Sequence, residues 1–542
     1  MLQRRFVVGG FAVLATAVLV LAAVFVSTAG AVPHSAAQAS SGLTPEVSAS
    51  AHHDLSPALR DLPAQATRFR GSPDRPLRSP ALSAGPDQPD GALQSTAGTP
   101  LAATTGLGFG GLGRGAGDPA NFCGCAPPDT NGAVGATQYV QIVNTGIGVF
   151  SKTTGAMAAG FPKAIHTLFT GFGGGCETND DGDPVAQYDQ AAGRWILSQF
   201  SVSTAPFLEC VAVSTSSDAT GTYNRYSFSY GTQFPDYPKI GVWPDAYYVT
   251  YNVFNGNSFG GPKTCAWDSA AMIAGAASAA QVCFQLGTTV ASILPADLDG
   301  TIAPPAGAPN FQLSLGSNAL SFFTFHVDFV TPANSTYTGP TSIPVAAFTQ
   351  ACSGGACIPQ PGTTQRLDSL ADRLMHRLAY RRFADGHESL LVSHAVRASG
   401  NRKNQVDGVR WYELRNPSTG TPTVFQQGTF SPDATSRWMS SIAMDKLGNI
   451  GVGYSASSGS SFPSVRITGR VPGDPAGTLE AETIVKPGAG SQLTNLNRWG
   501  DYSAMQVDPT DDCTFWYTNE YLKASGTFNW STWIESFKMP GC

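Results

Sequence analysis

The chain has 542 residues and a formal net charge of −6, and 13% of its residues are charged, about half of the roughly 25% found in typical soluble proteins. Sixty glycines and 38 prolines accompany this low charge. The combination excludes a coiled coil and a charge-driven disordered chain, and the acidic balance excludes a nucleic-acid-binding surface. No nucleic-acid partner is therefore expected.

The first 31 residues have the pattern of an export signal. Arg4 and Arg5 precede the uncharged apolar run Phe6–Val26, and Ala29–Ala31 forms a small-residue cleavage site. We expect a signal peptide over 1–31 and a secreted protein. The apolar run is also long enough for an uncleaved membrane anchor, which would hold the protein at the cell surface. No later segment is apolar enough to span a membrane.

Residues 32–117 are rich in Ala, Ser, Pro and Gly and show no sustained periodicity. Such a segment buries too little apolar surface to offset the entropy of ordering it. We therefore predict a disordered linker or propeptide over 32–117, followed by a folded domain over 118–542. The run Gly108–Gly113 matches GxGxxG, but its Gly-rich surroundings lack the strand and helix of a dinucleotide site.

All ten cysteines follow this segment, and an even number in an exported chain favours disulfides. Cys265–Cys283 and Cys352–Cys357 are the local pairs we expect, and Cys542 is expected to attach the C-terminus to an earlier strand. The close spacing of Cys352 and Cys357 also suits a metal. However, no histidine cluster or second CxxC completes a zinc site.

A hairpin pattern recurs through the folded part of the chain. Each copy has a short strand of alternating apolar residues, a turn marked by Asp or Gly, and a second alternating strand. Seven copies, at intervals of roughly 50–70 residues, begin near residues 128, 185, 240, 308, 372, 443 and 505.

The repeat predicts an all-β fold: a single β-propeller, most simply with seven blades, with six or eight as alternatives. Ring closure would hide the edges of the sheets. Residues 370–381 also fit a helix, but the repeat favours a strand there. Asp268–Ala280 predicts a short helix that begins at an Asp N-cap.

Ser216–Tyr223 resembles an Asp-box, the turn motif of sialidase-type propellers. In that superfamily the box is structural, so the resemblance implies the fold rather than catalysis. More broadly, the chain from residue 123 onward resembles exported bacterial propeller proteins, through Pro127–Gly132, Phe234–Lys239 and Arg498–Ser503.

Five aspartates stand just ahead of predicted first strands: Asp129, Asp183, Asp236, Asp372 and Asp501. Equivalent positions in successive blades would bring these carboxylates to one mouth of the axial channel. Crowded carboxylates raise one another's pKa, which can supply the acid of an acid/base pair. The plainer alternative is that each aspartate caps its own turn.

Other side chains extend this hypothesis. Arg498 and Tyr502 are candidate catalytic neighbours of Asp501, and Glu520 is a candidate by location. Sialidase-like enzymes hold a substrate carboxylate with three arginines, for which Arg373, Arg377, Arg437 and Arg498 are available, although no three of them match the family's motifs. Four Arg-Trp pairs could present tryptophans to sugars, but blade packing is favoured.

Calcium is the one cofactor that the sequence suggests. Residues 179–183 read Asn-Asp-Asp-Gly-Asp, so Asp181 and Asp183 could bind Ca²⁺ through their oxygens. The distal Glu of an EF-hand is missing, and no other cofactor is indicated.

Two functions follow from these features. The first is a carbohydrate-active enzyme, a glycoside hydrolase or lyase, with acid/base carboxylates at the axial mouth and a polysaccharide or surface glycan as its partner. The second is a non-catalytic propeller that binds glycan or protein at the cell surface. The fold alone does not decide between them.

Overall fold

The computed structural model describes residues 42–72, 74, 87–120 and 122–542. The chain divides into two compact units, Met1–Ala39 and Ser40–Cys542, and all described residues belong to the second. The predicted signal peptide over 1–31 lies outside the described residues. Among the described residues, no helix has the length and apolarity needed to cross a membrane.

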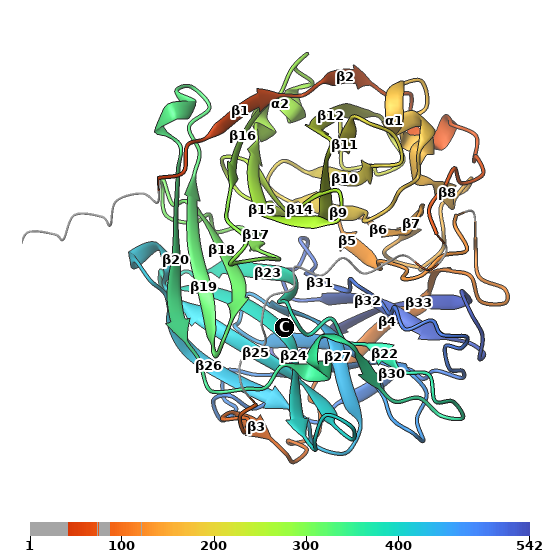
Figure 1. Cartoon of the computed structure of the whole chain (residues 1–542), viewed down its shortest axis with the longest axis vertical. Coiled ribbons are helices and arrows are strands. Elements are labelled where there is room, and N and C mark those ends of the chain that lie inside the picture. Colours follow the sequence, from red (N-terminus) through yellow and green to blue (C-terminus); the bar gives the residue numbers. More distant parts are fainter. Residues whose placement is uncertain (1–41, 73, 75–86, 121) are drawn as a thin grey trace, which may run out of the picture. The chain divides into compact units, whose positions relative to one another are not determined.

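The second unit is built from antiparallel sheets whose inner strands follow one another in a ring (Figure 1). Each inner strand contacts the next, and the last contacts the first. The described residues contain seven such strands: β5 (Asn131–Val134), β9 (Val185–Asp189), β13 (Gln233–Val242), β17 (Leu294–Asp299), β23 (Met375–Arg382), β27 (Ser436–Met444) and β31 (Ala504–Val507).

Outward from the ring, each inner strand is followed by a second and a third antiparallel strand. The second strands are β6 (Gln138–Val143), β10 (Arg194–Ser201), β14 (Tyr247–Asn255), β18 (Asn310–Gly316), β24 (Glu388–Ser399), β28 (Ile450–Ser457) and β32 (Phe515–Leu522). The third strands are β7 (Gly146–Ser151), β11 (Phe207–Ser214), β15 (Ser258–Trp267), β19 (Ala319–His326), β25 (Val406–Arg415), β29 (Ser464–Arg470) and β33 (Trp530–Lys538).

A fourth strand completes each group. Six of these follow in chain order: β8 (Lys163–Ala164), β12 (Tyr223–Gly231), β16 (Ala280–Gln285), β20 (Thr336–Pro344), β26 (Thr423–Phe430) and β30 (Thr483–Lys486). The last group is completed from the N-terminal side by β4 (Thr104–Gly113), which pairs antiparallel with β33. These radiating four-stranded groups form an all-β propeller, as the hairpin repeat predicted.

The remaining elements are short. β21 (Ala356–Ile358) and β22 (Leu367–Asp368) form a small separate sheet. In the described part of the chain the α-helices are α1 (Gly174–Thr178) and α2 (Ser269–Ala274), and the 3₁₀ turns are Leu59–Asp61, Ile165–Phe169, Pro332–Asn334, Ala351–Gly354 and Pro417–Thr419. Asp268 caps α2 by accepting from Ala271 N at 2.9 Å, as predicted. The helix ends early because Gly275 adopts the left-handed conformation, and β16 follows.

The expectation of a disordered linker over 32–117 is wrong for the described part of that segment. β1 (Glu46–Ala49) pairs with β16, β2 (His52–Leu55) with β12, and β3 (Leu93–Gln94) with β26. The low apolar content of the segment cannot stabilise it, but its backbone forms hydrogen bonds with the open edges of the sheets, and these bonds hold it in place.

The Gly-rich run that resembled a nucleotide motif is the strand β4. A Cβ atom at Gly108 would collide with Glu535, and one at Gly113 would collide with Asp118. Glycine therefore permits close approach of β4 to its neighbours. Leu112 on the same strand is fully buried. The folded unit thus includes residues ahead of the predicted boundary at 118.

The hydrophobic core lies between neighbouring sheets, so both faces of a sheet are buried. On β24, Leu390 and Val392 pack into one core layer and Leu391 into the next. Successive strand residues point to opposite faces, and two buried faces make the strand a continuous apolar run. The Asp-box behaves as the resemblance implied: Asp218 Oδ1 accepts from Thr220 N at 2.9 Å in the β11–β12 turn.

The cysteine pairings expected from local spacing are confirmed. Cys265–Cys283 and Cys352–Cys357 are disulfides, and Cys542 bonds Cys513 just ahead of β32. Two further disulfides are Cys123–Cys125 and Cys176–Cys210.

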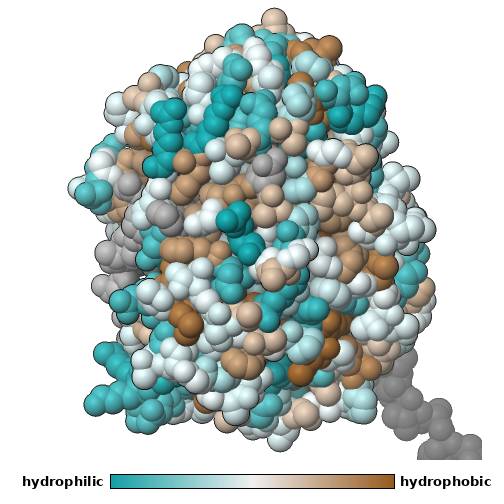
Figure 2. Space-filling view, turned by 90° about the vertical axis from the view of Figure 1, so that its right-hand side faces the viewer, coloured by the Kyte–Doolittle hydropathy of each residue, from teal (hydrophilic) through white to brown (hydrophobic). Residues whose placement is uncertain are grey.

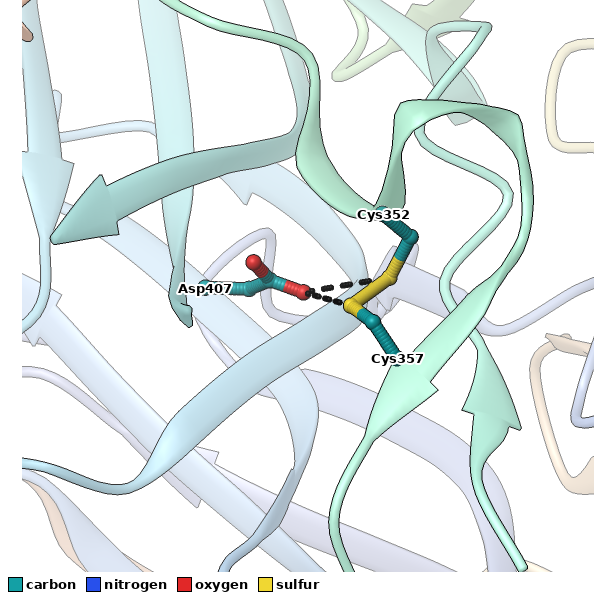
Figure 3. A group of neighbouring side chains, drawn as sticks. All are labelled: Cys352, Cys357 and Asp407. Carbon is teal, nitrogen blue, oxygen red and sulfur yellow. Dashed lines mark hydrogen bonds between the residues drawn. A yellow bond between two sulfur atoms is a disulfide. The ribbon is translucent and has the colours of Figure 1, made fainter. Parts of the chain in front are cut away.

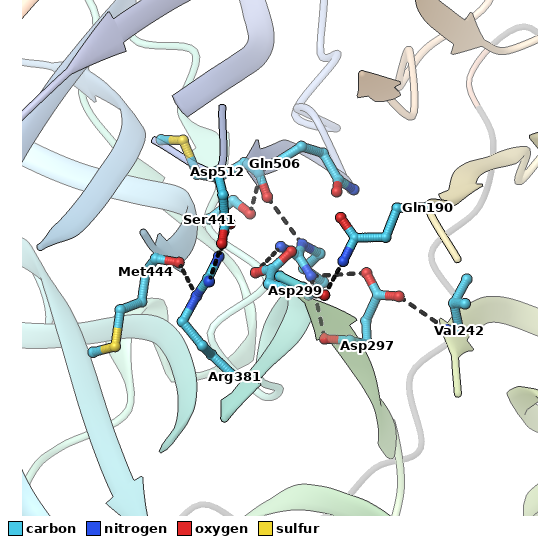
Figure 4. Close-up of polar contacts among 12 residues, drawn as sticks. Gln190, Val242, Asp297, Asp299, Arg381, Ser441, Met444, Gln506 and Asp512 are labelled. Atoms are coloured by element: carbon cyan, nitrogen blue, oxygen red, sulfur yellow. Dashed lines mark hydrogen bonds and ion pairs between the residues drawn. The ribbon is translucent and has the colours of Figure 1, made fainter. Parts of the chain in front are cut away.

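A buried polar network joins the inner strands along the axis (Figure 4). Arg377 on β23 donates to Asp297 Oδ2 at 2.8 Å and also to Asp299, both on β17. Gln187 on β9 donates to Asp297 Oδ2 at 3.2 Å and accepts from Gln506 on β31 at 3.0 Å. Burial raises the pKa of Asp297 to about 6 against the opposing attraction of Arg377. Side chains therefore link four of the inner strands across the axis.

Candidate functional site

Surface composition does not single out a docking face. Hydrophilic and hydrophobic residues are intermixed on the face shown in Figure 2. The exposed large hydrophobic side chains among the described residues are spread over several sheets: Val47, Leu55, Leu93, Ile302, Val330, Phe425, Leu447 and Ile484. Scattered exposed apolar residues are normal on soluble proteins.

A cavity of about 290 Å³ brings together acidic and basic side chains from separate blades. Its acidic lining residues stand at or near the starts of inner strands, because equivalent strand ends meet at one mouth of a propeller. They are Asp129 ahead of β5, Asp181 and Asp183 ahead of β9, Asp236 in β13, and Asp501 ahead of β31. Arg373 and Arg498 also line it.

Four of the lining residues adopt a backbone conformation that L-amino acids seldom use. The φ angles are 50° at Asp129, 45° at Asp183, 59° at Tyr237 and 61° at Asp501. Aspartate tolerates this left-handed region better than most residues, whereas tyrosine does not. Such strain persists only where the surroundings fix it, and it gathers at functional sites.

Each lining arginine is paired with an aspartate. Arg498 Nη2 donates to Asp501 Oδ2, and Arg373 binds Asp372 through two bonds of 2.7 and 3.0 Å. Burial raises the pKa of Asp501, against the opposing charges of Arg498 and Arg373, and Asp183 raises it further. Within the described residues, Asp501 Oδ1 has no hydrogen-bond partner. The surroundings of Asp501 thus favour its protonated form.

Behind the cavity wall, an amine lies between two aromatic rings. Lys239 Nζ is 3.2 Å from the ring centre of Tyr237 and 3.4 Å from that of Tyr502. Burial lowers the pKa of Lys239 well below its usual value, although Asp183 and other acidic neighbours oppose the shift. The Tyr502 hydroxyl donates to Pro238 O at 3.2 Å. This stack supports the lining residues Tyr237 and Asp183 from within.

Asp181 has a structural task in the rim of the cavity. Its carboxylate accepts from Val202 N at 2.6 Å and from Ser203 N at 2.7 Å. These bonds fix the turn after β10, as in the turn-capping alternative for isolated aspartates. Asp183 N donates to Asn144 Oδ1 at 3.0 Å. Calcium at Asp181 and Asp183 stays a prediction.

A segment ahead of the predicted domain contributes to the lining of the cavity. Phe69, Gly71 and Ser72 line the cavity together with the aspartates. Arg68 N donates to Asp180 Oδ2 at 2.7 Å, which anchors the segment to the loop before β9. The composition of 32–117 gave no sign that the segment lines a cavity, because a lone aromatic residue such as Phe69 in a low-complexity segment produces no periodic pattern.

Several predicted site residues lie elsewhere. Asp372 and Tyr502 do not line the cavity: Asp372 holds Arg373, and Tyr502 lies behind the wall. Arg377 belongs to the axial network, and Arg437 pairs with Glu482 at 2.8 Å.

Glu520 is fully buried. Its Oε2 accepts from Gly500 N at 2.8 Å, and burial raises its pKa well above the usual range. The packing interpretation of the Arg-Trp pairs is confirmed, because all four tryptophans are fully buried: Trp195, Trp411, Trp438 and Trp499.

Comparison with known proteins gives weak structural likenesses. No protein-family model matches the chain, and no curated protein matches it. An α-L-arabinanase from Penicillium chrysogenum is 10% identical, with a TM-score of 0.33, over 68% of this chain and 98% of the arabinanase. An ulvan lyase from a new family of polysaccharide lyases is 12% identical, with a TM-score of 0.27, over 77% of this chain and 81% of the lyase. A subtype N10 neuraminidase-like protein of A/little yellow-shouldered bat/Guatemala is 11% identical, with a TM-score of 0.25, over 56% of this chain and 96% of that protein.

Proposed function

We propose that the chain is an exported carbohydrate-active enzyme, a glycoside hydrolase or lyase, with its active site in the axial cavity. The observation that carries the proposal is the meeting of Asp129, Asp183, Asp236 and Asp501 with two arginines in one cavity. Most glycoside hydrolases use two carboxyl groups in different protonation states. The five disulfides support export, because such bonds form in oxidising compartments.

The raised pKa of Asp501 suggests one of the two roles. Asp501, whose pKa is raised by burial, is the proposed general acid that protonates the leaving oxygen. Asp183 or Asp129 would act as the base, or as the nucleophile in a retaining reaction. Five lining carboxylates outnumber two lining arginines. A neutral glycan therefore suits the cavity better than a polyanionic one, which favours the hydrolase over a lyase, because a lyase acts on uronate-containing chains.

The first prediction concerns Asp501. Asp501→Asn should lower kcat/KM by about 100-fold or more, because general acid–base catalysis contributes about 10²–10⁴-fold. The measurement is a screen of neutral and uronate-containing polysaccharides for reducing ends and unsaturated products. Wild type, Asp501→Asn and Asp236→Asn are compared, each with and without EDTA. Loss of activity in EDTA would show that the reaction needs a metal. The calcium predicted at Asp181 and Asp183 would then be the candidate.

The control is an aspartate that caps a turn away from the cavity. Asp328 accepts from Val330 N at 2.9 Å and Thr331 N at 2.8 Å, and asparagine can keep this role. Asp328→Asn should retain full activity. If Asp501→Asn and Asp236→Asn keep full activity at an unchanged Tm, the axial carboxylates do not take part in the reaction.

A non-catalytic glycan-binding propeller is the second candidate, favoured by the aromatic residues that line the cavity. Phe69 and Phe234 lie among the lining residues, and an aromatic face suits the apolar face of a sugar. If no substrate is turned over while a glycan still binds and Phe69→Ala weakens that binding, the binding function replaces the enzymatic one.

Under either function, Phe69→Ala should weaken glycan binding about tenfold with little change in Tm. Truncating a central aromatic contact typically costs more than about 1 kcal/mol of binding energy. Isothermal titration or KM measures the effect. Phe425→Ala is the matched control, because Phe425 is 51% exposed and lies outside the cavity. Equal effects of the two substitutions would argue against a glycan contact at Phe69.

A further inference from the structure

Three groups that can bind a metal meet in one cluster of the described residues, away from the axial cavity. The sulfurs of Cys352 and Cys357 and a carboxylate oxygen of Asp407 lie within 4.8 Å of one another (Figure 3). Cys352 and Cys357 are partly exposed and joined as a disulfide, whereas Asp407 on β25 is fully buried. None of the three lines the axial cavity.

The disulfide form leaves the carboxylate poorly matched to its surroundings. Asp407 Oδ2 lies 3.4 Å from Cys352 Sγ and 3.2 Å from Cys357 Sγ. A disulfide sulfur carries no hydrogen, so neither contact gives Oδ2 a donor. The other oxygen, Oδ1, accepts from Gln405 Nε2 at 2.6 Å. Burying a carboxylate against two sulfurs costs free energy unless a hydrogen-bond donor or a cation binds the carboxylate.

The surroundings suit two separated thiolates. Ser369 Oγ lies 3.2 Å from Cys352 Sγ, and Gln405 Nε2 lies 3.1 Å from Cys357 Sγ. Each is a donor that can stabilise a thiolate and orient it as a ligand. The intervening residues include Gly354 and Gly355, whose conformational freedom lets the sulfurs move apart once their bond is broken.

We infer that Cys352, Cys357 and Asp407 form a redox-gated site for a thiophilic divalent cation such as Zn²⁺. A dithiol reductant supplies two electrons and two protons, the S–S bond breaks, two thiols form, and the reductant becomes a disulfide. The cation then displaces the two thiol protons and binds two thiolates and the carboxylate. One tetrahedral position is left for water. A disulfide oxidant closes the site: the cation leaves, the S–S bond re-forms by thiol–disulfide exchange, and the oxidant takes up two electrons and two protons to become a dithiol.

The test uses Co²⁺ as the probe on the whole chain. The protein is reduced with dithiothreitol under native conditions, desalted without oxygen, and titrated with Co²⁺. Thiolate-to-cobalt charge-transfer absorption reports binding, and circular dichroism confirms that the fold is kept. We expect absorption in the reduced protein only. Asp407→Asn should weaken binding at least about tenfold, because even residues that merely orient metal ligands cost 10–100-fold when lost.

Two paired variants separate this site from the other cysteines. Cys352→Ser with Cys357→Ser should abolish the absorption, whereas Cys513→Ser with Cys542→Ser should keep it. Oxidised Asp407→Asn should have a Tm no lower than wild type, because the substitution removes a buried charge whose Oδ2 faces two sulfurs that carry no hydrogen. The inference is overturned if the Cys352/Cys357 double variant still gives the absorption, if reduced Asp407→Asn binds as tightly as wild type, or if mild reduction unfolds the chain.

Discussion

A chain that begins at residue 118 should lose most of the stability that a chain beginning at residue 42 has. The shorter chain lacks β4, which supplies the outer strand of the sheet formed by β31, β32 and β33. Leu112 on β4 is fully buried, and its N–H donates to the buried Gln141 Oε1 at 2.7 Å. Deleting one buried leucine side chain alone costs about 2–5 kcal/mol, and here an entire strand is removed.

Thermal unfolding followed by circular dichroism, together with the soluble yield, measures this effect. A chain that begins at residue 87 is the comparison, because it keeps β3 and β4 but loses β1, β2 and the 3₁₀ turn Leu59–Asp61. Leu59 is fully buried, so the Tm of this chain should lie below that of the chain from residue 42 and above that of the chain from residue 118. Equal Tm values for the chains starting at 42 and 118 would show that β4 is dispensable.

The carboxylates were predictable because a propeller repeats one geometry. Inner strands run in the same direction along the axis, so residues ahead of them reach the same mouth, and Asp129, Asp183 and Asp501 do so. The prediction failed at Asp372 because neighbouring residues project differently. Arg373, one position later, lines the cavity instead, and it forms an ion pair with Asp372.

Two elements were missed for physical reasons that lie outside local sequence. The inner strand β17 is short, and its Asp297 and Asp299 are buried carboxylates that make sense only once Arg377 of β23 is beside them. The hairpin copy predicted near 308–328 therefore corresponds to the second and third strands, β18 and β19, and misses the inner strand β17. β4 was missed because a Gly-rich strand is held by the sheet edge it joins rather than by its own side chains.

The axial network gives the second large effect: Arg377→Met should destabilise the protein by about 3–5 kcal/mol, as expected when one partner of a buried ion pair is removed. Arg377 is 1% exposed and bonds both Asp297 and Asp299. Methionine keeps the side-chain volume but leaves two buried carboxylates without their cation. Arg382→Met, on the same strand and partly exposed, should cost far less.

The pH dependence identifies the cause of that loss. The pKa of Asp297 is already raised by burial to about 6 in the wild type, above the unfolded value of about 3.9, and removing Arg377 should raise it further. A carboxyl with a raised folded-state pKa contributes stability that is fully present below the unfolded pKa and lost as pH rises through the folded pKa. The penalty of Arg377→Met should therefore be small near pH 4 and full at pH 8, as chemical denaturation at both values will show.

A double variant separates charge from packing. Asp297→Asn added to Arg377→Met removes one of the two orphaned charges, so part of the lost stability should return at pH 8 and little should change near pH 4. If the penalty of Arg377→Met were the same at both pH values and the double variant recovered nothing, the arginine would act through its packing alone. The axial network would then be a spacer between blades rather than an electrostatic link that joins them.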